Sequence, residues 1–527
     1  MDRSIRQSLL PLIALTAYAL TACGVNPVTG KNEVQFISQE GEIRIGQQNY
    51  APSRQSQGGD YVVLPELTTY VNEVGQKLAA VSDRQLPYEF VVLNSSVPNA
   101  WALPGGKIAV NRGLLTTLDN EGELAAVLGH EIVHAAARHG AKAQERGTFL
   151  QVGMVAAQIG VAMSDVNPNV ANLGMQVAGL GAQAFMMKYG RGAELEADQY
   201  GIKYLRAAGY DPAAAVTLQQ KFLALSQKDG RAQQGWLEGL FASHPPSAER
   251  VERNQAAIAA LGAGGDLGVD RYQARLKPLL AIKPAYDKAD EALLAATKKD
   301  FTRARALAGE AARMLPREAS FHQLLGDLAM AEKQPQQALP FYEKSIQINP
   351  NYFGPFLGGG VASYKLGNKQ RAEQWLTTSA EMLPTAPALY YLGMIAKEQG
   401  NSQRAAQFFK QVAGAEGELG QLAATEFTVL DLPQNPGNYV ATALQLNQQG
   451  AVVAVIQNRA PIALTAVAVT PLRVNAAGQI IEQGRTLRVD RILQPGEQIV
   501  VDMGIGVVSA EVAQQMRIRV DGARAAQ

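Results

Sequence analysis

Between residue 26 and about residue 265, apolar positions recur with two different periods. The segments Pro65 to Val81, Glu121 to Arg138 and Asp211 to Gln227 carry apolar residues at helical spacing, whereas Phe90 to Leu93 is a short continuous apolar run. Helical spacing predicts amphipathic helices, and a short apolar run predicts a buried strand. We therefore expect an α+β domain over this region, dominated by helix.

The region from about Ala285 to Ala415 repeats with a period of about 34 residues. Alanines and following prolines recur at matching positions, which are Ala304 and Pro316, Ala338 and Pro350, and Ala372 and Pro384. Gly326, Gly360 and Gly393 precede successive repeat alanines at one common spacing. The pattern resembles tetratricopeptide repeats, in which small residues let two antiparallel helices approach and a proline ends the second helix. It predicts a short α-helical solenoid whose concave face binds a partner, or else a helical spacer.

The last hundred residues alternate between β-rich runs and turn signals. The runs cover residues 451–456, 464–470, 486–489, 498–501 and 516–520. They predict an antiparallel all-β domain resembling a sandwich. The whole chain is then multidomain, with residues 1–23 as a leader, 24–270 as the α+β domain, 271–425 as the repeats and 426–527 as the β-rich domain.

Charge and cysteine content restrict the chemistry of this 527-residue chain. Lysine and arginine total 48 against 47 acidic residues. A dedicated nucleic-acid binder needs a strongly basic surface, so nucleic acid is not expected as a partner. A single cysteine forms neither an intrachain disulfide nor a cysteine-based metal site. Any bound metal must be held by histidine and carboxylate side chains.

The N-terminal segment has the features of an export signal. Arg3 and Arg6 precede an apolar run from Ser8 to Leu20 that is too short to span a bilayer. Cys23 directly follows the sequence Leu-Thr-Ala, which resembles the lipobox of bacterial lipoproteins. We expect lipidation of Cys23, and Gly24 after it favours anchoring to the outer membrane. The alternative is an ordinary signal peptide with a chance cysteine.

A tract of very low charge follows the second predicted helix. Between Phe149 and Met187 the only charged residue is Asp165. Each half of the tract is short for a membrane span, so two buried helices are the favoured interpretation over a hairpin that dips into a membrane. The tract could also act as a lid that limits access to a site.

Residues 129–134 read Gly-His-Glu-Ile-Val-His within the predicted helix Glu121 to Arg138. His130 and His134 are four residues apart, so both imidazoles project from one helical face and can bind one zinc ion. Glu131 lies beside that face. An adjacent glutamate can take a proton from a zinc-activated water as the water attacks a peptide carbonyl.

A catalytic zinc site needs a third protein ligand and an open position. His139 is unsuitable because it lies about 140° around the helix from His134, so we interpret it as structural or surface-exposed. Glu194 and Asp198 share one face of a later helical segment, with Glu196 on the other side. Glu194 can coordinate the metal while Asp198 orients a histidine ligand. The alternative is an acidic, solvent-exposed first turn.

Together these motifs resemble a known peptidase family. The chain contains His130-Glu131-X-X-His134 followed by Glu194-X-X-X-Asp198. This combination is similar to the signature of peptidase family forty-eight of clan MA, the metallopeptidase family that contains HtpX and the CAAX prenyl proteases. The resemblance covers about residues 26–255. It implies a zincin fold and one zinc ion bound by His130, His134 and Glu194, with Glu131 as the base.

Two further elements gain a role from this resemblance. Pro104-Gly105-Gly106 and the alternating residues from Lys107 predict a turn into an exposed edge strand, beside which an extended peptide substrate can bind. The residues assigned to this substrate strand are Asn99, Ala100, Pro104, Gly105, Gly106, Ile108 and Val110. The alternative is an ordinary strand within a sheet, and both can hold at once.

His244 lies in a loop, between Ser243 and Pro245. It can steady the oxyanion of the tetrahedral intermediate or block the open zinc position until substrate arrives. Arg250 is expected to hold that loop or the intermediate. His322, in a repeat helix, is expected to be incidental to the chemistry.

These expectations combine into a periplasmic zinc endopeptidase that is lipid-anchored to the outer membrane. By resemblance, its substrates are unfolded or misassembled outer-membrane proteins, and the repeats bind substrate or dock on the outer-membrane assembly machinery. The rival interpretation is a chaperone-like scaffold in which the protease site is gated or idle. A third, CAAX processing, requires membrane helices around the active site, and we expect none.

Overall fold

The computed structural model describes residues 23–146, 189–227, 243–262 and 264–526. The chain forms two compact units, Met1–Ala362 and Ser363–Gln527, and each is described by itself. The predicted leader before Cys23 and the low-charge tract from Phe149 to Met187 lie outside the described residues. The predicted domain boundaries at residues 270 and 425 stay predictions.

The described part of the first unit begins with short strands and continues mainly as helices. Its strands are β1 (Cys23–Val25), β2 (Asn32–Val34), β3 (Glu89–Leu93), β4 (Ala100–Leu103) and β5 (Lys107–Asn111). Its helices are α2 (Gln39–Ser56), α3 (Pro65–Ala79), α4 (Arg112–Leu115), α5 (Glu121–Ala136), α7 (Arg191–Ala207), α8 (Ala213–Gln227), α10 (Ala248–Leu261), α11 (Val269–Thr297), α12 (Phe301–Met314), α13 (Ala319–Ala331) and α14 (Pro335–Ile348). Helix α15 (Phe353–Lys365) contains the boundary between the units. The predicted α+β domain dominated by helix is confirmed.

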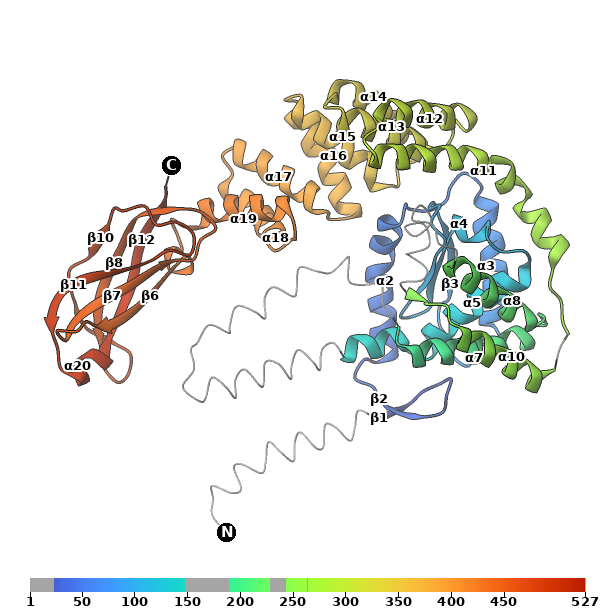
Figure 1. Cartoon of the computed structure of the whole chain (residues 1–527), viewed down its shortest axis with the longest axis horizontal. Coiled ribbons are helices and arrows are strands. Elements are labelled where there is room, and N and C mark those ends of the chain that lie inside the picture. The colour runs from blue at the N-terminus through green and yellow to red at the C-terminus, as the bar shows by residue number, and fades with distance from the viewer. Residues whose placement is uncertain (1–22, 147–188, 228–242, 263, 527) are drawn as a thin grey trace, which may run out of the picture. The chain divides into compact units, whose positions relative to one another are not determined.

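A three-stranded sheet in the order β3-β5-β4 is buried on both faces. One face packs on Tyr50 of α2 through Val91, Leu93, Trp101, Leu103 and Ala109. The other face joins a large core with α3 and α5 through Phe90, Val92, Ala100, Ala102, Ile108 and Val110. Figure 1 shows α2 on one side of the sheet and α3 and α5 on the other. Burial on both faces is why the strands read as apolar runs instead of alternating with polar residues.

The prediction that the strand from Lys107 is an exposed edge is wrong. Strand β5 pairs in parallel with β3 and antiparallel with β4, so it is the centre of the sheet. Gly105 and Gly106 have φ angles of 80° and 85°, which suit the tight turn that folds β4 back beside β5. The outer strands are β3 and β4, and β4 is the strand directly before the turn. The predicted residues are distributed as follows: Ala100 in β4, Ile108 and Val110 in β5, Asn99 directly before β4, and Pro104, Gly105 and Gly106 between the two strands.

Helix α5 begins directly after Asn120, which caps its first turn. The side chain of Asn120 accepts a hydrogen bond from the backbone N–H of Glu123 at 2.9 Å. The Glu123 carboxylate accepts from the backbone N–H of Asp119 at 2.8 Å, one residue earlier than a standard capping box. Every residue of α5 is buried.

Helices α5 and α7 approach closely because glycines lie where they meet. A Cβ atom on Gly201 would lie 3.2 Å from the backbone nitrogen of His130, and one on Gly129 would lie 3.2 Å from the Leu205 side chain. Both distances are tighter than ordinary packing allows. The two glycines therefore let the helix that carries His130 lie directly against the helix that carries Glu194 and Asp198.

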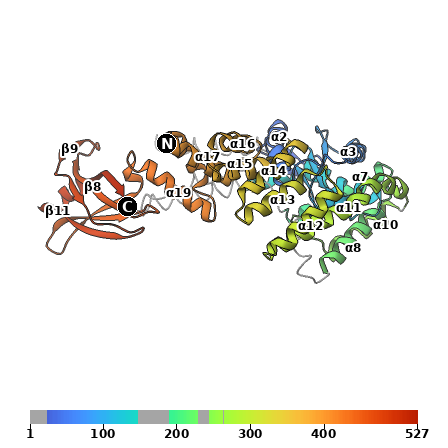
Figure 2. The ribbon, with the colours of Figure 1, turned by 90° about the horizontal axis from the view of Figure 1, so that it is seen from above.

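The helices after α11 follow the predicted repeat. Helices α12, α14 and α16 (Lys369–Met382) each end two residues before a repeat proline. A Cβ on Gly326 of α13 would lie 2.7 Å from the ring of Tyr342 in α14, which explains the small residue at that repeat position. Helices α12, α13 and α14 lie side by side in sequence order (Figure 2). Residues of α11, α12 and α13 belong to the same hydrophobic core as α3 and α5, so the first repeat helices and the α+β domain fold around one core.

The second unit continues the repeats and then becomes β-rich. Its remaining helices are α17 (Ala386–Glu398), α18 (Ser402–Val412), α19 (Glu418–Asp431), the 3₁₀ helix η2 (Pro436–Asn438) and α20 (Ala510–Gln515). Its strands are β6 (Val440–Leu446), β7 (Ala451–Asn458), β8 (Leu464–Val474), β9 (Ile480–Gln483), β10 (Leu487–Val489), β11 (Gln498–Val507) and β12 (Met516–Ala525). All five predicted runs are strands, and the prediction missed β6 and β9.

Two antiparallel sheets make up this β-rich region. One has the order β11-β7-β6, and the other has the order β10-β8-β12 with β9 beside β8. Residues of both sheets, among them Ile456 of β7 and Val467 of β8, form one hydrophobic cluster. Among the described residues of both units, no helix combines the length and the apolar character needed to cross a membrane.

Candidate metal centre

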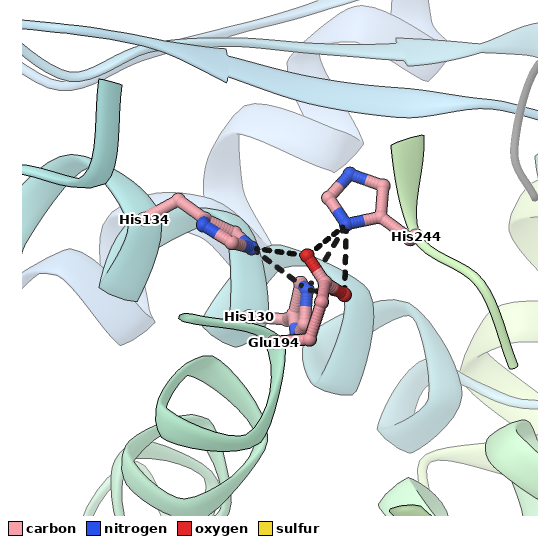
Figure 3. A group of neighbouring side chains, drawn as sticks. All are labelled: His130, His134, Glu194 and His244. Carbon is pink, nitrogen blue, oxygen red and sulfur yellow. Dashed lines mark hydrogen bonds and ion pairs between the residues drawn. The ribbon is translucent and has the colours of Figure 1, made fainter. Parts of the chain in front are cut away.

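Four buried side chains from three parts of the first unit point toward one another (Figure 3). Helix α5 supplies His130 and His134, the first turn of α7 supplies Glu194, and the segment before α10 supplies His244. One potential ligand atom of each lies within 4.8 Å of all the others. The structure thus brings together the two predicted histidines and the glutamate 60 residues further along the chain.

The distances within this group suit a single metal ion. The Nε2 atoms of His130 and His134 are 3.0 Å apart, and each lies 3.4 Å from a Glu194 carboxylate oxygen. Ligand atoms arranged tetrahedrally around zinc lie about 3.3–3.5 Å from one another. Imidazole nitrogen and carboxylate oxygen are also ligands that zinc accepts. The group therefore fits one zinc ion.

Hydrogen bonds to the far side of each imidazole hold the two helix histidines in place. Nδ1 of His130 lies 2.9 Å from Asp198 Oδ1, as predicted for an orienting carboxylate. Arg250 fixes that carboxylate by donating to both of its oxygens, at 2.6 and 2.7 Å. Because the Nδ1 atom is occupied, Nε2 is the nitrogen left to face the centre of the group.

Sequence reasoning missed two residues that support His134. His139 lies outside the ligand group, in line with the prediction that it is not a metal ligand. Its Nδ1 lies 2.8 Å from Nδ1 of His134, and its Nε2 lies 3.1 Å from Glu196. Tyr189 stacks on the His134 ring with centroids 3.9 Å apart. The positive φ of Arg138, 63°, ends the helix and turns the chain just before His139, which no helical projection foresees. No motif spacing points to Tyr189.

The charges around the group favour a cation. Burial opposes protonation of His130, but the carboxylates of Glu194 and Asp198 outweigh burial and raise its pKa to about 10. Burial lowers the pKa of His134. Burial alone would raise the pKa of Glu194, but the neighbouring histidines, His130 foremost, lower it. Glu194 is therefore an ionised carboxylate and His134 a neutral imidazole, both in the form that binds zinc, whereas His130 must release its proton when zinc binds.

Glu131 lies beside the group without belonging to it. It is 2% exposed, and its Oε2 atom has no hydrogen-bond partner. Burial raises the pKa of this carboxyl group, which makes its carboxylate a stronger base. An unpartnered carboxylate oxygen at this position is suited to accept a proton from a water molecule at the centre.

His244 takes up the fourth side of the group. Its Nδ1 lies 3.3 Å from His130 Nε2 and 3.1 Å from a Glu194 oxygen, and its Nε2 lies 3.4 Å from Glu131 Oε1. Arg250 holds the loop by donating to the Pro245 carbonyl oxygen at 3.3 Å, and it also pairs with Glu194 at 3.0 Å. Of the two roles predicted for His244, its position among the ligand atoms favours that of a fourth group facing the metal.

His322 lies apart from this group. Its Nε2 is 3.0 Å from the Pro316 carbonyl oxygen within the repeats.

A mainly helical α+β domain with two histidines four residues apart on one helix, and a glutamate from a second helix, has the architecture of a zinc metallopeptidase. Comparison with known proteins agrees with this class. Residues 65–258 match the model of peptidase family M48, and residues 319–352 match a tetratricopeptide repeat. The chain belongs to peptidase family M48 and carries tetratricopeptide repeats after the peptidase domain.

Curated relatives include both mitochondrial and bacterial proteases. The chain is 32% identical over 243 residues to the mitochondrial metalloendopeptidase OMA1 of Schizosaccharomyces pombe, covering 45% of this chain and 66% of that protein. It is 30% identical to the β-barrel assembly-enhancing protease of Yersinia pestis, covering 40% of this chain and 43% of the relative, and 30% identical to that of Escherichia coli, covering 38% and 44%. The matches thus span less than half of the length of the two bacterial relatives.

Proposed function

We propose that this protein is a zinc endopeptidase. The observation that carries the proposal is the buried group of His130, His134 and Glu194 beside the unpartnered carboxylate oxygen of Glu131. The three residues of the group would hold the ion, and Asp198 would keep His130 in the ligating tautomer. Arg250 would maintain Asp198 and the His244 loop in place.

Each residue has a defined part in peptide hydrolysis. Zinc, when bound, supplies a Lewis acid that activates water and polarises the scissile carbonyl. Glu131 accepts a proton from the attacking water and later delivers it to the leaving amine as the C–N bond breaks. The low exposure of Glu131 and of the ligand group excludes bulk water, which strengthens these electrostatic interactions.

The outer side of β4 would bind the substrate backbone. The backbone N–H of Asn111 donates to the Asn99 carbonyl at 2.8 Å, so these two residues form a hydrogen-bonded pair between the strands. Along an antiparallel ladder, hydrogen-bonded pairs alternate with pairs whose N–H and C=O groups point away from the partner strand. Ala100 and Ala102 therefore direct their N–H and C=O groups away from β5. The Tyr189 hydroxyl, next to His134, donates to the Ala102 carbonyl at 3.3 Å, which places this edge beside the metal group. A peptide added along β4 would contact the protein through its backbone, so many sequences would be accepted.

The proposal is tested by incubating the chain from residue 24 onward with an unfolded outer-membrane barrel protein. We expect cleavage that stops when a chelator removes zinc and returns when zinc is added back. Barrel protein that is bound but not cut, with zinc present, would contradict the proposal and would support the chaperone-like scaffold. The position of His244 among the ligand atoms is the observation that favours this second candidate, since it would leave the site closed.

Replacing His244 by Ala is expected to increase cleavage several-fold. The imidazole lies on the fourth side of the ligand group, where water and the scissile carbonyl must enter. Its removal opens that position and leaves His130, His134 and Glu194 in place. The measurement is the initial rate of cleavage of an unfolded chain at saturating zinc. A large fall in rate, with zinc content unchanged, would assign His244 to stabilising the oxyanion instead.

The names of the bacterial relatives extend the proposal to substrates and partners. Two relatives are named β-barrel assembly-enhancing proteases. We place this chain, by analogy, in the periplasm, where it would cleave unfolded or misassembled outer-membrane proteins. The repeats would bind the substrate or dock on the assembly machinery, because stacked helical repeats offer an extended binding surface.

A lipid on Cys23 would anchor the protein to the outer membrane. Replacing Cys23 by Ala is expected to move the protein from the membrane fraction to the soluble periplasmic fraction, because the acyl chains supply the membrane affinity. Cell fractionation measures the distribution, and Glu131→Gln serves as the control that keeps the anchor. Equal membrane association of the Cys23 variant and the control would contradict lipid anchoring.

A further inference from the structure

A small pocket lies beside Glu131 and His244, between α5, α7 and α8. It has a volume of about 40 Å³. Its walls are largely apolar and include Val127, Ile202, Leu218 and Phe222. This volume exceeds what one water needs and is far below the roughly 150 Å³ of a cavity that holds benzene. The pocket therefore admits a side chain of two or three non-hydrogen atoms and excludes aromatic and long aliphatic ones.

Among the described residues of these walls, two side chains carry a buried oxygen without a partner, Glu131 and Gln219, and only Gln219 has no part in the proposed cleavage. Gln219 of α8 lines the pocket and is 5% exposed, and its Oε1 atom is buried without a hydrogen bond. A buried acceptor without a donor destabilises a folded protein, so native structures contain few of them. The unpartnered Gln219 oxygen is therefore not explained by packing, and Gln219 belongs neither to the ligand group nor to the residues that support it.

We propose that Gln219 makes the protease selective for serine or threonine at a residue that flanks the cleaved bond. This inference rests on the proposed function, because the pocket shares Glu131 and His244 with the site of cleavage. A side chain that enters it belongs to a residue next to the attacked carbonyl. A hydroxyl group fits the volume and donates the hydrogen bond that Oε1 lacks.

The charged groups of the pocket disfavour an aspartate side chain. Asp198 and Glu131 also line it, and the one arginine among its described wall residues, Arg250, is already paired with Asp198 and Glu194. An aspartate side chain would therefore face two carboxylates and the Gln219 oxygen, with no free arginine among the described wall residues to pair with. Valine has the shape of threonine but offers no donor and would leave Oε1 unpaired. Threonine and valine are thus a matched pair that differs in the hydrogen bond alone.

The experiment uses the chain from residue 24 onward, loaded with zinc, and peptides that differ in one residue on either side of the mapped scissile bond. At the selective position, we expect kcat/KM for threonine to exceed that for valine by about tenfold or more, the effect of one buried hydrogen bond. Leucine and phenylalanine peptides should be cleaved more slowly still. The Gln219→Leu variant should reduce the threonine-to-valine ratio to about one.

The Gln220→Leu variant is the matched control, because Gln220 is the exposed neighbour on the same helix. It should retain the ratio of the unmodified protein. Equal cleavage of threonine and valine peptides at both positions, or a ratio that survives in Gln219→Leu, would overturn the proposal. If the unmodified protein cleaves no peptide, the proposed function fails. The role of Gln219 is then decided by a second measurement, in which fluorescence anisotropy gives the affinity of the Glu131→Gln variant for the same peptides. Equal affinity for both peptides would then reject it.

Discussion

The Glu131→Gln variant is expected to lose proteolysis and keep its zinc. Glutamine has the shape of glutamate but cannot accept the proton of the attacking water. Glu131 lies outside the ligand group, so the metal should stay bound. Removal of a general base lowers the rate about 10²–10⁴-fold. The measurements are kcat/KM on an unfolded protein substrate and the zinc content of the purified variant.

The control for this variant is Glu252→Gln, which neutralises an exposed carboxylate on α10. It should cleave at the rate of the unmodified protein. If Glu131→Gln also cleaves at that rate, another group takes the proton and the assignment of Glu131 is wrong. If it loses both zinc and activity, Glu131 contributes to metal binding as well.

Replacing Glu194 by Gln is expected to remove zinc altogether. Glu194 is the one carboxylate in the described ligand group, and it contacts His130, His134 and His244. A neutral carboxamide leaves the ion without its anionic ligand. We expect zinc affinity to fall by more than about 100-fold, beyond the effect of changing a residue that merely orients a ligand. Competition with a chromophoric chelator measures the affinity.

Asp198→Asn provides the graded comparison for Glu194. Within the ligand group Asp198 is hydrogen-bonded to His130, and outside it to Arg250, so it orients a ligand and does not face the centre. Its variant should lose about 10–100-fold in zinc affinity. Zinc should also raise the melting temperature of the unmodified protein and not that of Glu194→Gln, because binding to the native state stabilises it. Full zinc affinity in Glu194→Gln would show that His244 serves as the third ligand.

Local sequence patterns predicted the elements of the site well. His130 and His134 lie on one helical face because four residues make about one turn, whatever surrounds the helix. Asn120 begins α5 and the repeat prolines follow helix ends because caps and prolines act over a few residues. The distant Glu194 was found through its spacing from Asp198 and the family resemblance, since no local rule connects it to α5.

Relations between elements were harder to predict. The strand from Lys107 was mistaken for an edge because its residues read as alternating after the turn at Gly105 and Gly106, whereas β5 is buried almost throughout and is paired on both sides. Strand β5 is central because it pairs with β3 as well as with β4. The pairing with β3 joins segments that are not adjacent in the chain, so no local pattern predicts it. The support of His134 by His139 and Tyr189 depends on the turn after α5 and on the approach of the chain before α7.

By itself, the sequence determined the main helices and most strands, the repeat spacing, the pair of histidines on one face and the limitation of metal ligands to histidine and carboxylate. Each follows from local geometry or composition. Tertiary structure alone decided that β4 and not β5 lies at an edge of the sheet, that His244 faces the metal group, and that Gln219 lines a pocket beside Glu131. Those facts depend on which distant segments pack together, and packing is set by the whole core instead of by any single segment.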